Sequence, residues 1–268
     1  MLRSKDCYYT KQEIARQLVA LLPPIPPGVT VVDPCAGSGA FSSCFKKCIA
    51  LDLHPAAPGI AQADYFQWEP PTGSRLWIVS NPPFGNGAAL AIRFFNRNFG
   101  AELIAFVLPR VWRKRSVLSR LDLQYSVVAA HPVPANAFIT PEGKEIDVPT
   151  DWTIWTRAPR PPPPPPLTNP AVHFLPSATG ADLVVQRLGR DAGRIQTKAR
   201  SGRSYLYLRI SDADLLARVR AQPNCFRESE QRDWCAGMPG LNHQDILEIL
   251  DSMTGTRSSP PAPPPAAQ

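Results

Sequence analysis

The chain has 268 residues, of which 44% are hydrophobic, enough for one sizeable core and a small additional module. Its formal net charge of +7 favours polyanionic partners such as nucleic acid, although charge alone does not identify one. There is no run of 18 apolar residues, and the first ten residues contain no apolar signal segment. We therefore expect neither a membrane span nor secretion.

The cysteine and proline patterns exclude further classes. The six cysteines include no Cys-x2-Cys pair, and no histidine lies near enough to Cys44 and Cys48 to complete a zinc set. We expect no metal site, and six reduced thiols in a cytoplasmic or nucleus-like reducing compartment. The 32 prolines cluster in residues 23–27, in residues 161–166 and in the tail, which indicates breaks and linkers.

The first elements of the chain are a helix and a strand. Apolar residues recur at helical spacing over residues 11–22, with Thr10 placed as the N-cap and Glu13 completing a capping box. The β-branched run of residues 29–33 predicts the first central strand, which leads into a Gly-x-Gly turn. A helix over roughly residues 40–48 should then direct its N-terminal N–H groups at a negative group.

Acidic side chains follow the ends of successive predicted strands. Asp52 closes the apolar run of residues 49–53, close to the ~20-residue spacing after Asp33 at which such acids bind a ribose. Asp64 ends a weaker third strand and is placed to receive an exocyclic amine. Each aspartate alone is better explained by a helix cap or a solvated loop charge, but the series on successive strand ends favours a ligand site.

A buried strand over residues 76–80 ends abruptly in Asn81-Pro82-Pro83-Phe84. Open α/β sheets bind ligands at this edge. The prolines make a stiff elbow, in which the Asn81 side-chain oxygen and the Pro82 carbonyl can accept both hydrogens of one planar NH2 group. Phe84 offers a face for a flat ring. An ordinary strand-to-loop turn is the alternative interpretation.

The remaining elements of the first domain alternate between strand and helix. A helix, a fifth strand and two closing strands are expected at residues 88–99, 102–109, 124–130 and 151–156. Residues 136–148 would form a loop near the site. The alternation predicts an α/β fold with a doubly wound parallel sheet.

The composition divides the chain into a first domain (1–159), a Pro-rich linker (160–170), a small basic module with β-structure (171–253) and a disordered Pro/Ala-rich tail (254–268). In the module we expect strands at residues 183–187 and 205–209 and helices at residues 212–221 and 243–253. Candidate nucleic-acid contacts are Arg113, Lys114 and Arg115 in the first domain, and Arg187, Arg190, Arg194, Lys198 and Arg200 in the module. Solvated basic loops are the alternative.

The order of these motifs resembles the S-adenosylmethionine-dependent amino-methyltransferases that act on adenine N6. The resemblance spans about residues 8–157 and depends on Tyr9-Thr10, Asp33-Pro34, Gly37, Gly39, Asp52, Asp64 and Asn81-Pro82-Pro83-Phe84. Residues 81–85, 91–96, 108–110, 147–149 and 154–155 are similar to a bacterial and phage-type subgroup, as are residues 187–195 in the second module. It implies a Rossmann-like methyltransferase sheet with a small C-terminal module.

The resemblance also implies residue roles. The methionyl part of the cofactor would contact Tyr9, Thr10 and the turn of Gly37, Gly39 and Phe41, beside Asp33 and Pro34. Asp52 would bind the cofactor ribose, and Asp64 its adenine. Asn81 and Pro82, followed by Pro83, would grip the target amine, while Phe84 stacks on a base flipped out of its strand.

The expected function is therefore methyl transfer from S-adenosylmethionine to adenine N6 in nucleic acid, with DNA preferred over RNA. Three alternatives stay open. The first is an RNA N6-adenine methyltransferase. The second is a protein glutamine N5-methyltransferase, a group that usually has Tyr in place of Phe84. The third is a non-catalytic binding subunit with a methyltransferase fold.

Overall fold

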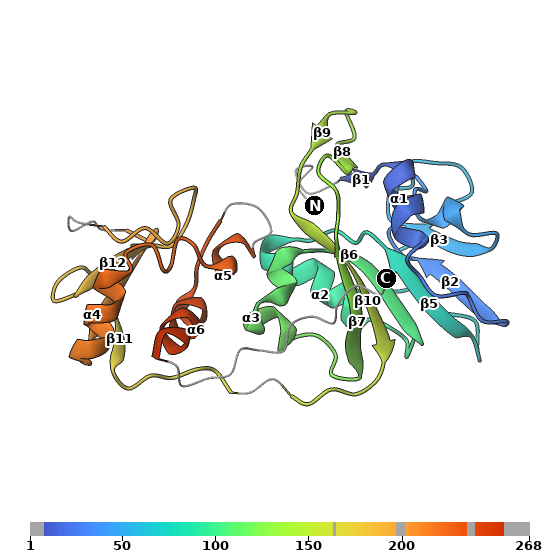
Figure 1. The fold of residues 1–268 in the computed structure, drawn as a ribbon. Helices are drawn as coiled ribbons and strands as arrows, with labels where there is room; N and C mark the ends of the chain where they lie inside the picture. Colours follow the sequence, from blue (N-terminus) through green and yellow to red (C-terminus); the bar gives the residue numbers. More distant parts are fainter. Residues whose placement is uncertain (1–7, 163–164, 197–201, 235–238, 255–268) are drawn as a thin grey trace. The chain divides into compact units, whose positions relative to one another are not determined.

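The computed structural model describes residues 8–162, 165–196, 202–234 and 239–254 (Figure 1). They form two compact units. The first contains residues 8–111 and 120–162, and the second contains residues 112–119 together with the described residues after 164. The second unit thus takes in a short segment from the middle of the first domain, which the sequence did not predict. Within the described ranges, no helix has the length and apolarity needed to cross a membrane.

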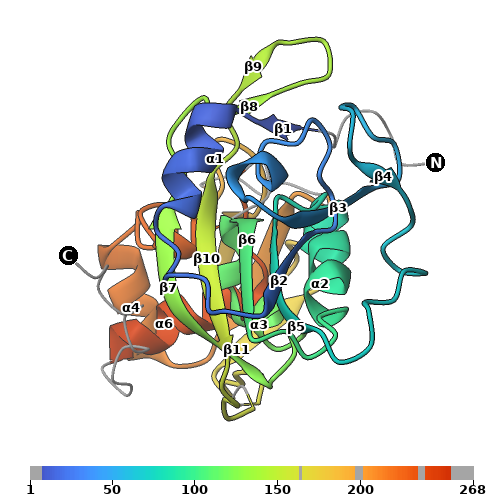
Figure 2. The same cartoon turned by 90° about the vertical axis from the view of Figure 1, so that its right-hand side faces the viewer.

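The first unit is built on a seven-stranded sheet of order β4-β3-β2-β5-β6-β10-β7, which can be followed in Figure 2. These strands are, in that order, Ala61–Gln62, Cys48–Asp52, Val29–Asp33, Arg75–Ser80, Leu103–Pro109, Thr150–Arg157 and Tyr125–Pro132. Strands β2 to β6 pair in parallel, and β10 is antiparallel to both of its neighbours. The sheet is Rossmann-like, and the predicted α/β fold class is confirmed.

The centre of the sheet is rigid because it is apolar on both faces. Every residue of β6 is buried, as are all residues of β5 except Arg75. Helix α2 (Ala89–Asn96) contributes Phe95, whose ring packs edge-to-face against Tyr125 and Trp155 at centroid distances of 5.8 and 5.0 Å. Edge-to-face aromatic pairs have a preferred geometry in addition to their burial. The packing of Phe95 therefore helps to position helix α2 against strands β7 and β10.

The segment before the sheet differs from the prediction. Helix α1 spans Gln12–Val19 and has Lys11, not Thr10, at its N-cap. Thr10 lies in strand β1 (Tyr9–Thr10), which pairs with β8 (Phe138–Ile139). The predicted loop over residues 136–148 is likewise wrong, because β8 forms a hairpin with β9 (Glu145–Ile146). A strand pairing between residues so far apart in the chain has overridden a local capping pattern.

The predicted helix over residues 40–48 is also wrong. Only a 3-10 turn, η2 (Ser42–Cys44), lies between Gly39 and the start of β3 at Cys48. Ser and Cys are poor helix formers, and so short a segment does not offset the cost of helix nucleation. The glycine turn is therefore followed by a tight backbone connection and not by a helix N-terminus.

The second unit has its own sheet, of order β11-β13-β12. Its elements are α3 (Arg115–Leu118), β11 (Val172–Leu175), β12 (Leu183–Gln186), β13 (Tyr205–Ile210), α4 (Ala213–Ala221), α5 (Glu230–Asp233) and α6 (His243–Thr254). Strands β12 and β13 and helices α4 and α6 were predicted, whereas β11 and α5 were not. Val185, Leu208, Phe226, Ile246 and Leu250 are fully buried together, so this unit has an independent core.

Candidate active site

The candidate site lies where the strand order reverses. Strand β2 pairs with β3 on one side and with β5 on the other, so the carboxyl ends of β2 and β5 are neighbours at a topological switch point. The Ser80 hydroxyl at the end of β5 donates a hydrogen bond of 2.7 Å to Asp33 Oδ1 at the end of β2, and both residues are buried. Ser80 was not among the residues predicted from the sequence, where its only signal is a hydroxyl at the end of an apolar strand.

The glycine turn packs against the N-terminal strand. Gly37 has φ +52°, and a Cβ atom there would lie only 2.8 Å from the Tyr9 ring, so a side chain at this position would displace Tyr9. The Gly37 N–H donates to Asp52 Oδ2 at 2.7 Å, and the His54 N–H donates to Asp52 Oδ1 at 2.8 Å. The structure therefore brings together Tyr9, the turn and the carboxylate of Asp52, as predicted for one site.

The Asn81 side chain is held by a hydrogen bond from its amide nitrogen, while its oxygen accepts no hydrogen bond from the described residues. Its amide nitrogen donates to the Thr10 hydroxyl at 3.1 Å, and Thr10 is only 5% exposed. Asn81 Oδ1 is buried and has no hydrogen-bond partner in the described part of the chain. The Pro82 carbonyl likewise receives no hydrogen bond from the described residues. Since buried acceptors are almost always satisfied, the free Asn81 Oδ1 atom, followed by an unbonded carbonyl, indicates a donor supplied by a ligand.

Two aromatic residues of the predicted site are packed into the protein. Phe84 is 9% exposed, and its carbonyl accepts the N–H groups of Leu90 and Ala91. Phe41 stacks on Trp152, with ring centroids 5.3 Å apart and an interplanar angle of 9°. Both rings are therefore buried in the first unit, and the contacts of Phe41 and Phe84 with a ligand stay predictions.

The positions of Pro34, Pro83 and Asp64 give weaker support for a ligand site. Pro34 is buried beside Asp33, and Pro83 is half-buried in the elbow. Asp64 is exposed and lies beyond the end of β4, which comprises only Ala61–Gln62. Its carboxylate accepts the Phe66 N–H at 2.9 Å, so it caps a turn while keeping free acceptor capacity.

Asp33 is the most perturbed acid of the site. Burial raises the pKa of its carboxyl to about 7, a shift opposed by the hydrogen bonds from Ser80 and the Cys35 N–H and increased by the charge of Asp52. Its Oδ2 atom has no hydrogen-bond partner within the described ranges. A buried carboxylate is costly unless a cation or donor meets it, so this atom is suited to a positively charged ligand group.

Asp33→Asn should make the protein more stable at pH 8. Because the folded-state pKa is raised, the native state binds the proton more tightly than the unfolded chain. This stabilisation is complete below about pH 4 and is lost as the pH rises through about 7. Asparagine carries no such charge, so the free energy of unfolding of the variant should be higher by up to roughly 4 kcal/mol at pH 8, with a smaller difference at pH 5. Urea denaturation at the two pH values measures both differences. Parallel pH dependence of the two proteins would contradict the assignment.

The basic residues predicted to contact nucleic acid differ in their exposure and in their partners. Lys114 is wrong as a phosphate contact, because its side chain is 5% exposed and its ammonium donates to Asp245 Oδ2 at 2.6 Å. Arg113 and Arg115 are half-buried in the second unit. Arg190 and Arg194 are exposed, and Arg187 lines a hollow described below. Lys198 and Arg200 lie outside the described residues.

Metal-binding residues do not gather in the part of the chain that the structure describes: no group of three or more His, Cys, Asp or Glu side chains there could hold an ion. The Cys35 thiol, which lies beside Asp33, has its pKa raised by burial. The polar side chains described near the switch point are thus carboxylates, an amide, hydroxyls and this thiol.

Comparisons with known proteins give a similarity of fold alone. No protein-family model matches the chain, and neither does any curated protein. Among solved structures, a Pyrococcus horikoshii protein assigned as an RNA methyltransferase is 13% identical, with a TM-score of 0.38, over 55% of this chain and 81% of that one.

Two other similar structures belong to restriction-modification systems. One is assigned as the modification subunit of a type I restriction enzyme from Vibrio vulnificus (14% identity, TM-score 0.42, 93% of this chain). The other is a type I restriction-modification methyltransferase subunit from Streptococcus thermophilus (14% identity, TM-score 0.40, 87% of this chain). The chain spans only 62% and 56% of the lengths of these two subunits. We draw no functional conclusion from similarities at this level.

Proposed function

We propose that the protein transfers a methyl group from S-adenosylmethionine to the N6 amino group of adenine in nucleic acid, with DNA as the preferred substrate. The observation that carries this proposal is the buried, unpartnered Oδ1 atom of Asn81. The hydrogen bond to Thr10 fixes the amide, and the unbonded Pro82 carbonyl follows in the chain. This pair of oxygens matches the two hydrogens of a planar amine.

The residues around the glycine turn fit the proposed cofactor. Asp33 Oδ2 is a buried acceptor without a partner, which suits the ammonium of a methionyl group. Each Asp52 oxygen accepts one backbone N–H and retains a lone pair for a ribose hydroxyl. Asp64 keeps acceptor capacity for an exocyclic amine. When bound, S-adenosylmethionine supplies an electrophilic methyl carbon on a sulfonium.

The protein's contribution to the reaction is positioning. An aromatic amine is a weak nucleophile because its lone pair is delocalised into the ring. Hydrogen bonds to Asn81 Oδ1 and the Pro82 carbonyl favour a tetrahedral nitrogen, which frees the lone pair to attack in line. S-adenosylmethionine held by the glycine turn, Asp33, Asp52 and Asp64 would supply the methyl carbon to this nitrogen and leave as a neutral thioether, and the extra proton of the amine would pass to water. Orientation and fixed dipoles supply the rate enhancement without a strong general base.

The proposed activity predicts a specific labelled product. Methyl-tritiated S-adenosylmethionine should transfer its label into DNA, and nucleoside digestion should place the label in N6-methyldeoxyadenosine. Matched pools of RNA and of protein, incubated alongside, distinguish the alternatives. Label in RNA alone would identify an RNA adenine methyltransferase, and label in protein alone a glutamine methyltransferase. Cofactor binding by calorimetry without any transfer would indicate a non-catalytic subunit.

A further inference from the structure

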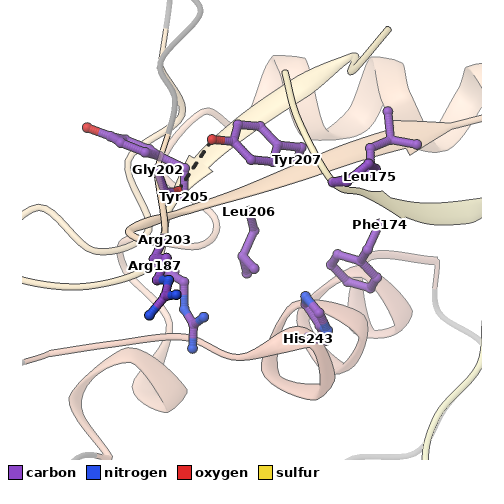
Figure 3. Close-up of a pocket in the computed structure, with 10 residues that line it drawn as sticks. Phe174, Leu175, Arg187, Gly202, Arg203, Tyr205, Leu206, Tyr207 and His243 are labelled. Carbon is purple, nitrogen blue, oxygen red and sulfur yellow. Dashed lines mark hydrogen bonds between the residues drawn. The ribbon is translucent and has the colours of Figure 1, made fainter. Parts of the chain in front are cut away.

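A hollow with a volume of about 410 Å3 opens in the second unit, on elements that belong entirely to that unit. Figure 3 shows Phe174 and His243 on one side of it, Arg187 and Arg203 on the other, and Leu206 between them. The rings of Tyr205 and Tyr207 lie across strand β13 from Leu206. The volume falls within the range of sites that bind small organic groups.

One side of the hollow is cationic. Arg187 and Arg203 both line it, and none of the described residues that line it carries a carboxylate. The Nε atom of Arg187 is buried and makes no hydrogen bond within the described ranges, and Arg203 is exposed. A buried donor without an acceptor costs free energy, which an incoming anion would offset. Two guanidinium groups suit a phosphate, since they can donate to several of its oxygens.

The opposite side of the hollow is aromatic. The rings of Phe174 and His243 are 4.1 Å apart at their centroids and inclined by 30°. Burial, and then the charge of Arg187, lower the pKa of His243, which favours the neutral imidazole. A neutral imidazole beside a phenyl ring offers a surface on which a flat heterocycle can stack.

We infer that this hollow binds one nucleotide of the nucleic-acid strand, with the base against Phe174 and His243 and the phosphate against Arg187 and Arg203. The inference rests on the proposed function, which supplies nucleic acid as the substrate. Because a base within a duplex is stacked on both faces, only a single-stranded or extruded nucleotide can enter. The second unit therefore holds the strand at a position other than the target adenine.

Calorimetric titration of the full-length protein with thymidine 5′-monophosphate tests this site, with thymidine and inorganic phosphate as separate probes. The nucleotide should bind at least about tenfold more tightly than either part alone. Arg203→Gln and Phe174→Leu should each weaken nucleotide binding by about tenfold, since each removes one of the two contacts. Arg220→Gln is the matched control, because Arg220 is an exposed arginine of α4 outside the hollow. It should change nothing.

The methyl-transfer assay gives a second readout. Arg203→Gln and Phe174→Leu should raise KM for DNA and leave kcat unchanged, because they remove binding that is equal in the ground and transition states. The inference would be overturned if inorganic phosphate bound as tightly as the nucleotide. It would also be overturned if O-phosphotyrosine bound more tightly than the nucleotide. Methyl transfer with unchanged KM in both variants would also overturn it. Nucleotide binding without any methyl transfer would support the hollow and contradict the proposed activity, so the two failures are distinguishable.

Discussion

Asn81→Ala should reduce the turnover number for methyl transfer by 10²-fold or more, while the dissociation constant of the cofactor changes by no more than about twofold. Loss of one fixed dipole at the reacting atom typically costs 10²- to 10³-fold in kcat. The Oδ1 atom of Asn81 is buried and unpartnered within the described ranges, so the one internal hydrogen bond that the described residues show being lost is the bond from the amide nitrogen to Thr10. Single-turnover kinetics and calorimetry with the cofactor measure the two quantities separately.

Two further variants make this result interpretable. Asn81→Asp retains an acceptor oxygen at the same position and should keep more activity than Asn81→Ala, although its hydrogen bond to Thr10 is altered. Asn86→Ala removes an exposed asparagine beyond the elbow and should behave as the natural sequence does. An equal loss of turnover and of cofactor affinity in Asn81→Ala would show that the residue only maintains the local structure.

Lys114→Ala should lower the free energy of unfolding of the second unit by about 3–5 kcal/mol, the usual effect of removing one partner of a buried ion pair. The side chains of Lys114 and Asp245 are 5% and 4% exposed, and the ammonium also donates to the Gly240 carbonyl at 3.0 Å. Without Lys114, the Asp245 carboxylate is left buried without its cation. Urea denaturation at pH 7 measures the effect.

The double variant Lys114→Met with Asp245→Leu separates the charge from the packing. It removes both charges and fills a similar volume, so it should recover most of the lost stability. Lys46→Ala, at an exposed lysine of the first unit, should change the unfolding free energy by less than about 0.5 kcal/mol. A loss in the double variant as large as in Lys114→Ala would show that shape, and not the unpaired charge, sets the cost.

What the sequence could predict was local in origin. The apolar run of β5 and the two prolines that follow it define a buried strand and its rigid exit without reference to any other segment, and the structure has β5 over Arg75–Ser80. The α/β fold class followed from the alternation of strand and helix, whereas the order of the strands in the sheet was not predicted. The glycine turn and Asp52 were placed together because the carboxyl ends of parallel strands meet at one edge.

What the sequence could not predict depends on distant pairings. Thr10 fits a helix cap by its neighbours, but its backbone pairs with Phe138 in the β8–β9 hairpin. That pairing is what brings the Thr10 hydroxyl to Asn81. Lys114 was predicted, as one of three neighbouring basic residues, to contact nucleic acid. Only the fold reveals that it contacts Asp245, 131 residues further along the chain. A local pattern carries no information about such partners.

The two units are interwoven along the chain. Residues 112–119, which follow β6 and the start of its 3-10 turn, belong to the second unit, and the chain then returns to the first at residue 120. Cutting the protein after residue 162 would separate Lys114 from Gly240 and Asp245, which its ammonium contacts within the second unit. The fragment that ends at residue 162 would then carry an ammonium without its carboxylate partner, so dividing the chain there breaks a buried ion pair.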